Sequence, residues 1–209
     1  MIRKLGLFTC LFSSFLISGC TRVFTPQPVS PNSFQQIPWS VREKRLSALV
    51  EWKIRGAFSF NDHSDKVRMA SYSWAQQGQT YEIYIHAALN LYGAVIKGAP
   101  GSVQLYRGSN KPVTADSPED LMQAQLGYSL PISDLQYWVR GLPAISKHSA
   151  TYDSWGHIST LKQDGWTIHF DRYRPIPNQP FNTIDVPRLL ELSNGHIDLR
   201  IVINSWNGY

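Results

Sequence analysis

The sequence predicts a mainly β protein with added helices (α+β), built on a curved antiparallel sheet or barrel. Segments in which apolar and polar residues alternate recur along the chain, and turn residues separate them. Each such strand has one apolar face, which is typical of an antiparallel sheet that covers a core on one side. One leading segment and two central segments have helical signals instead.

The N-terminus predicts a lipoprotein. Arg3 and Lys4 precede an apolar run of about 13 residues, which is too short to span a bilayer but fits a signal peptide. The run ends in Ile-Ser-Gly-Cys over 17–20, the lipobox pattern, in which small side chains flank the scissile bond and the thiol receives diacylglycerol. We therefore expect a signal peptide over 1–19 and Cys20 as an N-palmitoyl, S-diacylglycerol cysteine. An ordinary signal peptide with a chance Cys is the weaker alternative.

The rest of the chain divides into a tether and one domain. Residues 20–38 are rich in Pro, Ser and Gln and too poor in apolar residues to fold, so we expect a flexible tether. An Asp directly after the lipidated Cys resembles an inner-membrane retention signal. Thr21 occupies that position here, and the absence of Asp favours the outer membrane. Residues 39–209 are long enough for one sizeable domain.

Composition excludes several classes of protein. Without Arg3 and Lys4, 18 Lys and Arg oppose 15 Asp and Glu, a net charge of +3, and no dense basic block is present. Nucleic acid is therefore not an expected partner. Cys10 leaves with the signal peptide and Cys20 is consumed by lipidation, so the mature chain has no disulfide.

No catalytic motif emerges, so the chain is not expected to be an enzyme, and no cofactor is expected. His169 and Asp171 share the polar face of a predicted strand and could hold a ligand together. A solvated pair is the more common arrangement, and we predict no metal site.

The elements follow in order. A helix is predicted over 39–49, with Val41, Arg45, Ala48 and Trp52 near one stripe and Leu46 and Leu49 close to it. Ser117, Pro118 and two acidic residues start a second helix, and a third begins near Ser133 and ends at Gly141, with Pro143 after it. Alternating strand patterns cover 52–60, 68–74, 81–86, 103–105, 166–171 and 196–203.

One predicted hairpin connection, residues 86–93, is unusually apolar. It carries Leu89, Leu91 and Tyr92 where a hairpin loop is normally polar. These side chains could tuck under the edge of the sheet. Alternatively, they could form an exposed apolar tip that touches lipid or a partner.

Together these residues resemble the LolB family of outer-membrane lipoprotein receptors, over nearly all of the mature chain from Trp39 onward. No single segment is decisive, but the order and spacing of the segments are specific. The segments that carry the resemblance are the lipobox and residues 54–60, 72–76, 90–93, 113–116 and 138–143.

The resemblance implies a fold and a function. The fold is an unclosed antiparallel β-barrel whose apolar concave cavity is covered by helices. The function is to accept mature lipoproteins from the periplasmic carrier LolA, hold their acyl chains in the cavity and insert them into the inner leaflet of the outer membrane. The implied partners are LolA, lipoprotein acyl chains and outer-membrane phospholipid, and we expect a monomer.

The resemblance also points to site residues. The family needs an apolar residue at the tip of a protruding loop, which here corresponds to Leu91 or Tyr92. The usual pattern resembles Asn-Pro-Leu-Gly, and this chain has Leu91 and Tyr92 in place of the Pro and the Leu. Tyr suits a membrane interface. The candidate residues for lining the acyl cavity are Phe58, Trp74, Ile83, Trp138 and Trp166.

Two alternatives stay open. Each of the three tryptophans could be ordinary core, Trp138 above all, because it lies on a predicted covering helix. The whole chain could be a structural or assembly-scaffold lipoprotein of the outer membrane, with a filled core and no lipid cavity.

Overall fold

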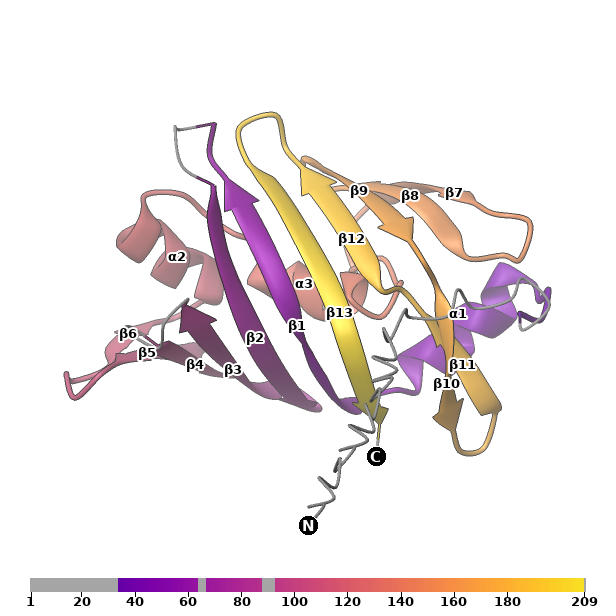
Figure 1. Ribbon diagram of the computed structural model, residues 1–209, viewed down its shortest axis with the longest axis horizontal. Coiled ribbons are helices and arrows are strands. Elements are labelled where there is room, and N and C mark those ends of the chain that lie inside the picture. The colour runs from indigo at the N-terminus through magenta and orange to yellow at the C-terminus, as the bar shows by residue number, and fades with distance from the viewer. Residues whose placement is uncertain (1–33, 64–66, 88–92, 209) are drawn as a thin grey trace, which may run out of the picture.

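The computed structural model describes residues 34–63, 67–87 and 93–208 as one curved sheet with helices on its concave side (Figure 1). Eleven strands pair in the order β6-β5-β4-β3-β2-β1-β13-β12-β9-β8-β7, and every pairing is antiparallel. In this described part the edge strands β6 and β7 do not pair with each other, so the barrel is open. The predicted mainly β fold, with its unclosed antiparallel sheet and helices, is confirmed.

The bounds of the elements show which predictions were complete. The sequence patterns located β1, β2, β3, β5, β9 and β13, but they did not identify β6, β7, β8, β10, β11 or β12. Strand β4 was implied only as the strand that follows the predicted 86–93 connection. The strands of the main sheet are β1 (Glu51–Asn61), β2 (Arg68–Gln77), β3 (Thr80–Ala87), β4 (Gly93–Ala99), β5 (Ser102–Arg107), β6 (Val113–Ala115), β7 (His148–Tyr152), β8 (Ile158–Gln163), β9 (Trp166–Asp171), β12 (Leu189–Ser193) and β13 (Asp198–Gly208). The short hairpin is β10 (Arg174–Asn178) and β11 (Asn182–Val186).

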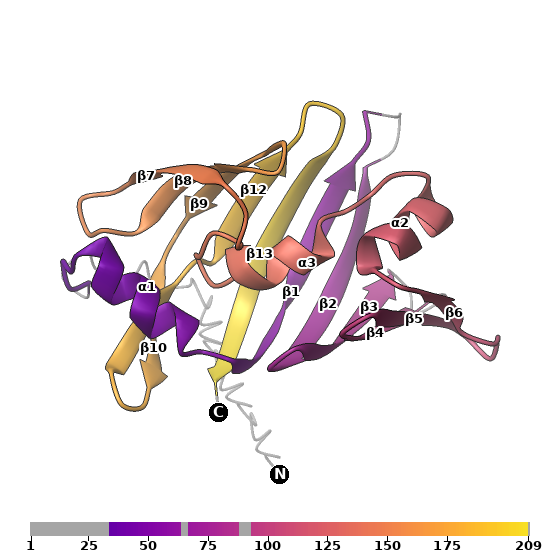
Figure 2. The same ribbon diagram turned by 180° about the vertical axis from the view of Figure 1, so that it is seen from behind.

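Seen from behind, helices α2 and α3 lie across the concave face of the sheet (Figure 2). Helix α2 (Pro118–Leu126) begins as predicted, because the Ser117 side chain accepts a hydrogen bond from the backbone N–H of Asp120 at 3.0 Å. Gly127 ends it in the left-handed conformation. Helix α3 (Ile132–Trp138) ends slightly earlier than predicted, although Gly141 does adopt a positive φ.

Helix α1 (Trp39–Ser47) corrects the predicted stripe. The buried positions are Arg42 and Leu46, whereas Val41 is 40% exposed. The inward face is therefore rotated by one residue from the predicted one. The physical reason is an ion pair: Arg42 Nη1 lies 2.8 Å from Asp185 Oδ2 of β11. Hydropathy alone assigns an arginine to solvent.

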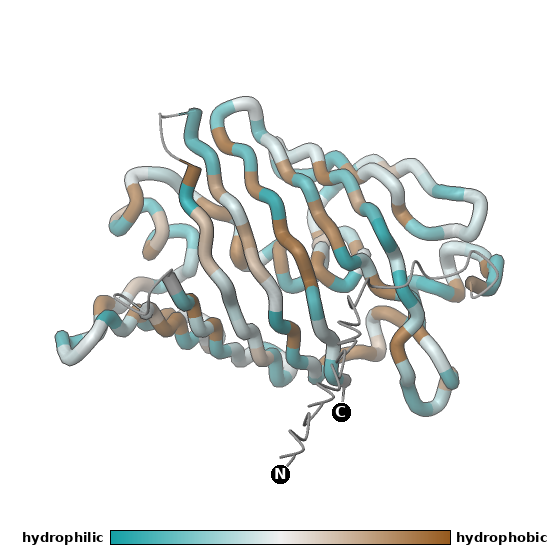
Figure 3. Tube along the Cα trace, viewed as in Figure 1, coloured by the Kyte–Doolittle hydropathy of each residue, from teal (hydrophilic) through white to brown (hydrophobic). Residues whose placement is uncertain are grey.

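The strands alternate between the two faces of the sheet, and the colouring along the chain follows this period of two (Figure 3). In β1, Trp52, Ile54 and Phe60 are buried inward. Gly56 lies on the same inward face, at a bulge opposite β13. A Cβ at Gly56 would collide with the carbonyl oxygen of Val202, so only glycine lets the two strands approach this closely.

Candidate functional site: an apolar cavity under two helices

An apolar cavity of about 420 Å³ lies between the sheet and helices α2 and α3. The sheet supplies one wall through inward-facing side chains of β1 to β4 and β13. The helices and the segment between them supply the other. Arg68 and Arg107 are the charged residues of its lining. The other lining residues are Phe58, Phe60, Met69, Ala70, Tyr72, Trp74, Ile83, Ile85, Ala94, Ile96, Met122, Leu126, Tyr128, Leu130, Ile132, Leu135, Val139, Leu199 and Ile201.

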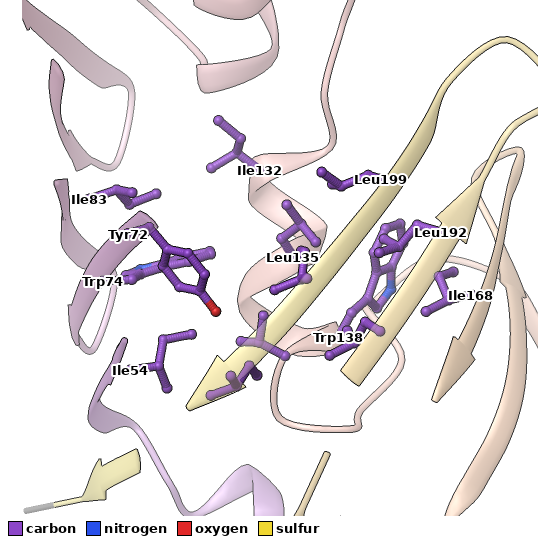
Figure 4. Close-up of a cluster of buried hydrophobic side chains, with 14 of the residues drawn as sticks. Ile54, Tyr72, Trp74, Ile83, Ile132, Leu135, Trp138, Ile168, Leu192 and Leu199 are labelled. Atoms are coloured by element: carbon purple, nitrogen blue, oxygen red, sulfur yellow. The ribbon is translucent and has the colours of Figure 1, made fainter. Parts of the chain in front are cut away.

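The cavity occupies one half of the barrel, and the other half is filled. In Figure 4, Tyr72, Trp74 and Ile83 lie on one side of α3, and Trp138 lies on the other side with Leu192 and Ile168. Trp138 is completely buried. Its Nε1 donates to Gln163 Oε1 at 3.0 Å, and the Gln163 side chain also bonds the backbone of Ala144. This satisfied polar contact fixes the end of α3 on the sheet.

The structure brings three of the five predicted cavity residues together. Phe58, Trp74 and Ile83 line the apolar cavity from neighbouring strands. Trp138 and Trp166 are not part of that lining and lie in the packed core. Contact of any of the five with an acyl chain stays a prediction.

The helical wall of the cavity, formed by Met122, Ile132 and Leu135, was not predicted from the sequence. The apolar side of each predicted helix was the available signal. This signal was not sufficient, because a helical pattern does not show whether a side chain packs against a core or faces a cavity. That depends on the side chains of the sheet opposite. Tyr72 was also missed, although it shares the inward face of β2 with Trp74.

Hydrogen bonds hold two large rings in the cavity wall. Trp74 Nε1 donates to Gln76 Oε1 at 3.0 Å, and the ring of Trp74 lies 5.3 Å from that of Trp52. The hydroxyl of Tyr72 donates to the carbonyl of Val202 across the sheet at 3.3 Å. Burial raises the pKa of Tyr72, so this hydroxyl keeps its proton near neutral pH. The wall thus presents carbon to the cavity while its polar atoms are paired.

One end of the cavity has an exposed apolar rim. Met69 lines the cavity and is 70% exposed, and Leu126 lines it from α2 and is 42% exposed. Arg68 stands beside them, and its Nη1 lies 2.8 Å from Asp62 Oδ2. Exposed apolar side chains at the mouth of an apolar cavity are typical of surfaces that meet lipid or a protein partner.

The β3–β4 connection leaves the sheet next to this cavity. Ile85 and Ala94 pair across the two strands, and both line the cavity. The predicted loop residues Leu89, Leu91 and Tyr92 follow Ile85 closely but lie outside the described residues, as does Cys20. Their roles therefore stay predictions.

A buried ionic cluster joins the start of the domain to its far side. Asp185 Oδ2 accepts from Arg42 and lies 3.1 Å from Nε2 of His157, whose Nδ1 lies 2.8 Å from Asp153 Oδ2. Burial raises the pKa of Asp185, but the hydrogen bonds from His157 and Arg42 outweigh it and lower the pKa overall. The ring of Phe34 packs 5.1 Å from that of His157, so contacts with the domain begin within the predicted tether.

The predicted His169–Asp171 pair does not form a shared site. His169 Nδ1 lies 3.2 Å from the hydroxyl of Thr160, whereas Asp171 pairs with Arg172. Within residues 34–63, 67–87 and 93–208, no group of three or more His, Cys, Asp or Glu could hold a metal ion. The same described residues contain no helix that is both long and apolar enough to cross a membrane.

Comparison with known proteins agrees with this geometry. The family model described as "Outer membrane lipoprotein LolB" matches residues 50–206. An outer-membrane lipoprotein LolB of Coxiella burnetii is 41% identical over 207 residues, which are 98% of this chain and 95% of that protein. Proteins of the same name from Marinobacter nauticus and Pseudomonas aeruginosa are 31% and 32% identical, over 99% and 97% of this chain and 98% and 96% of their own.

Solved structures share the fold at low sequence identity. A LolA superfamily protein from Nitrosomonas europaea superimposes with a TM-score of 0.52 at 7% identity, covering 83% of this chain and 94% of its own. A DUF1329 family protein from Desulfovibrio piger gives 0.51 at 9% identity, covering 81% and 90%. The open sheet with covering helices is thus a known architecture.

Proposed function

Since this chain belongs to the LolB family of outer-membrane lipoproteins, we propose that it accepts mature lipoproteins from the periplasmic carrier LolA and inserts them into the inner leaflet of the outer membrane. The apolar cavity carries this proposal. A cavity walled almost entirely by carbon takes the acyl chains of the cargo and replaces the bilayer while the cargo crosses water. The cavity also favours this function over a scaffold with a filled core.

Energetics explain why such a cavity is needed. A mature lipoprotein carries up to three acyl chains, and each buried methylene contributes about 0.8 kcal/mol. Release of bare chains into water is therefore very slow. The direction of transfer follows from the affinity for acyl chains, which is lowest in the carrier, higher in this receptor and highest in the membrane.

Two predicted contacts with the membrane, through Cys20 and through the β3–β4 connection, complete the proposal. Lipidated Cys20 holds the protein to the periplasmic side of the outer membrane. The β3–β4 connection, with Leu91 or Tyr92 at its tip and Leu89 beside them, touches the bilayer during insertion. The position of Ile85 and Ala94 on the cavity wall supports this role, because the connection follows the first of these cavity residues and precedes the second.

Filling the cavity from its wall tests the proposal. Ala70 of β2 lines the cavity, so Ala70→Phe should occupy part of its volume and weaken binding of a fluorescent fatty acid by about tenfold, equivalent to 1.4 kcal/mol. Ala57→Phe, placed between two inward-facing residues of β1 and thus on the opposite face, is the matched control and should bind normally. Undetectable binding to the unsubstituted protein would refute the cavity function.

A further inference from the structure

A second cavity of about 580 Å³ adjoins the apolar one, and the two share Trp74 and Ile132 in their walls. Its lining is mixed rather than apolar. Polar side chains reach it from β2 and β3, from the start of α2 and from α3. We call it the polar cavity, and its polar lining includes Gln76, Tyr81, Ser117, Ser133, Gln136 and Arg140.

Most of these polar groups already have partners. Gln76 accepts from Trp74 and donates to the carbonyl of Gly78 at 2.9 Å. Arg140 donates to the backbone carbonyls of Gln136 and Leu49, at 2.9 and 3.1 Å. Such pairing fixes the cavity's shape and leaves these groups little capacity for a ligand.

Tyr81 is different. Its hydroxyl is buried, and it has no hydrogen-bond partner in the part of the chain that the structure describes. The ring lies against Gly98 of β4, where a Cβ would collide with it, and its centre is 6.1 Å from that of the Trp74 ring. An unpaired buried hydroxyl is costly unless a ligand supplies the missing acceptor.

We propose that the polar cavity binds the uncharged head of the cargo, the acylated glyceryl-cysteine, with the Tyr81 hydroxyl donating to one of its ester or amide carbonyls. This inference rests on the proposed function, because the chains attached to that head would enter the adjoining apolar cavity. Ester and amide carbonyls accept hydrogen bonds without donating, and they match a site whose free group is a donor.

The charges around Tyr81 favour this head over the phosphate of a phospholipid. Asp116 lines the polar cavity. Burial, reinforced by the negative charge of Glu119, raises the pKa of Tyr81 to about 12, so the hydroxyl remains a donor at neutral pH. Both carboxylates repel an anionic phosphate but not an uncharged ester. Arg140, the cation in this lining, already donates to two backbone carbonyls.

Tyr81→Phe tests the proposal because it removes one unpaired oxygen and leaves the ring in place. The mature lipidated protein in detergent is titrated with a synthetic tripalmitoyl glyceryl-cysteine peptide, with palmitate and with phosphatidylglycerol. We expect about 3- to 10-fold weaker binding of the peptide and unchanged binding of palmitate. Tyr106→Phe removes a hydroxyl that bonds to Gln104 on β5, outside the lining of both cavities, and should change neither affinity.

Three outcomes would overturn the inference. Unchanged peptide binding in Tyr81→Phe would mean that the hydroxyl has no role, and equal weakening of peptide and palmitate would make Tyr81 merely structural. Phosphatidylglycerol binding that depends on the hydroxyl as strongly as peptide binding would assign the cavity to phospholipid. These results leave the proposed function standing, because that function fails when the unsubstituted protein does not bind palmitate.

Discussion

Trp74 and Trp138 are residues of one type, both buried on the concave side of the sheet, yet only Trp74 lines the apolar cavity. The sequence placed both among the candidates for the cavity wall, and Trp138 was the one most expected to be ordinary core. It could not decide which of them lines a cavity. Whether an inward ring meets a neighbour or a void depends on the side chains opposite. For Trp138 these include Gln163, which is distant in sequence and pairs with its indole N–H.

Arg42 is buried because of a partner that is distant in the sequence. Its burial depends on Asp185, 143 positions further along the chain, so no local pattern could predict it. A buried charge is stable only with such a partner. The predicted stripe of α1 missed Arg42 for this reason, although Leu46 and Leu49, which were expected close to the stripe, are buried.

Asp134 carries a prediction about pH. It lies in the first turn of α3, and burial, with the charges of Asp164 and Glu119, raises its pKa to about 6. The unfolded value is about 3.9, so the contribution of Asp134 to stability is fully present below that pH and is lost as the pH rises through 6. Asp134→Asn should therefore raise the free energy of unfolding at pH 7 by about 1 kcal/mol, after screening by solvent.

Chemical denaturation at pH 4 and pH 7 measures this effect of Asp134→Asn. The gain in stability should be present at pH 7 and nearly absent at pH 4, where the carboxyl in the folded protein is already protonated. An equal gain at both values would show that the charge of Asp134 is not its cause.

Among the elements, alternation predicted the strands β1, β2, β3, β5, β9 and β13, whose inward and outward residues differ clearly in hydropathy. It failed for short segments with less regular patterns. Strand β10 contains two prolines, and β7 has few buried side chains to create a pattern. Both helices over the sheet were predicted from residues near their ends, because Ser117, Pro118 and Gly141 act locally.

The β3–β4 connection carries a prediction about insertion. Leu91→Glu and Tyr92→Glu should each still accept cargo but slow its insertion by about 100-fold, because a carboxylate in hydrocarbon costs about 2.5–3.5 kcal/mol. Transfer of a labelled lipoprotein from loaded protein to vesicles measures the rate. Tyr84→Glu, exposed on β3, adds the same charge elsewhere and should insert normally. Normal insertion by both loop variants would exclude the loop from this step.

At the scale of the whole molecule, an open barrel combines a filled half with an empty one. The filled half, around Trp138, Ile168 and Leu192, gives the stability that a cavity cannot contribute. The open edge between β6 and β7 leaves α2 and α3 to complete the cover of the empty half. Alternation predicted the curved antiparallel sheet, but the opening of the barrel and its cavity were predicted only through the resemblance to a family, since residue patterns do not distinguish a filled barrel from a hollow one.

The lipid anchor carries a prediction at this scale. Cys20 raises the effective concentration of the domain at the target bilayer but takes no part in binding. Cys20→Ala should therefore keep its affinity for cargo and deliver it less accurately. Membrane fractionation of cells with this variant should show a reporter lipoprotein partly outside the outer membrane. Complete loss of cargo binding would contradict this division of roles.

If the apolar cavity receives acyl chains from the carrier, a labelled lipoprotein should pass from LolA to this protein in solution. LolA loaded with a labelled lipoprotein is mixed with the Cys20→Ala protein, and the label on each partner is measured after separation. We expect the label to move to this protein, and to stay on LolA when Ala70→Phe fills the cavity. Label that stays on the carrier in both cases would show that this protein does not take cargo from LolA. Label that moves equally in both would show that the apolar cavity does not receive the acyl chains.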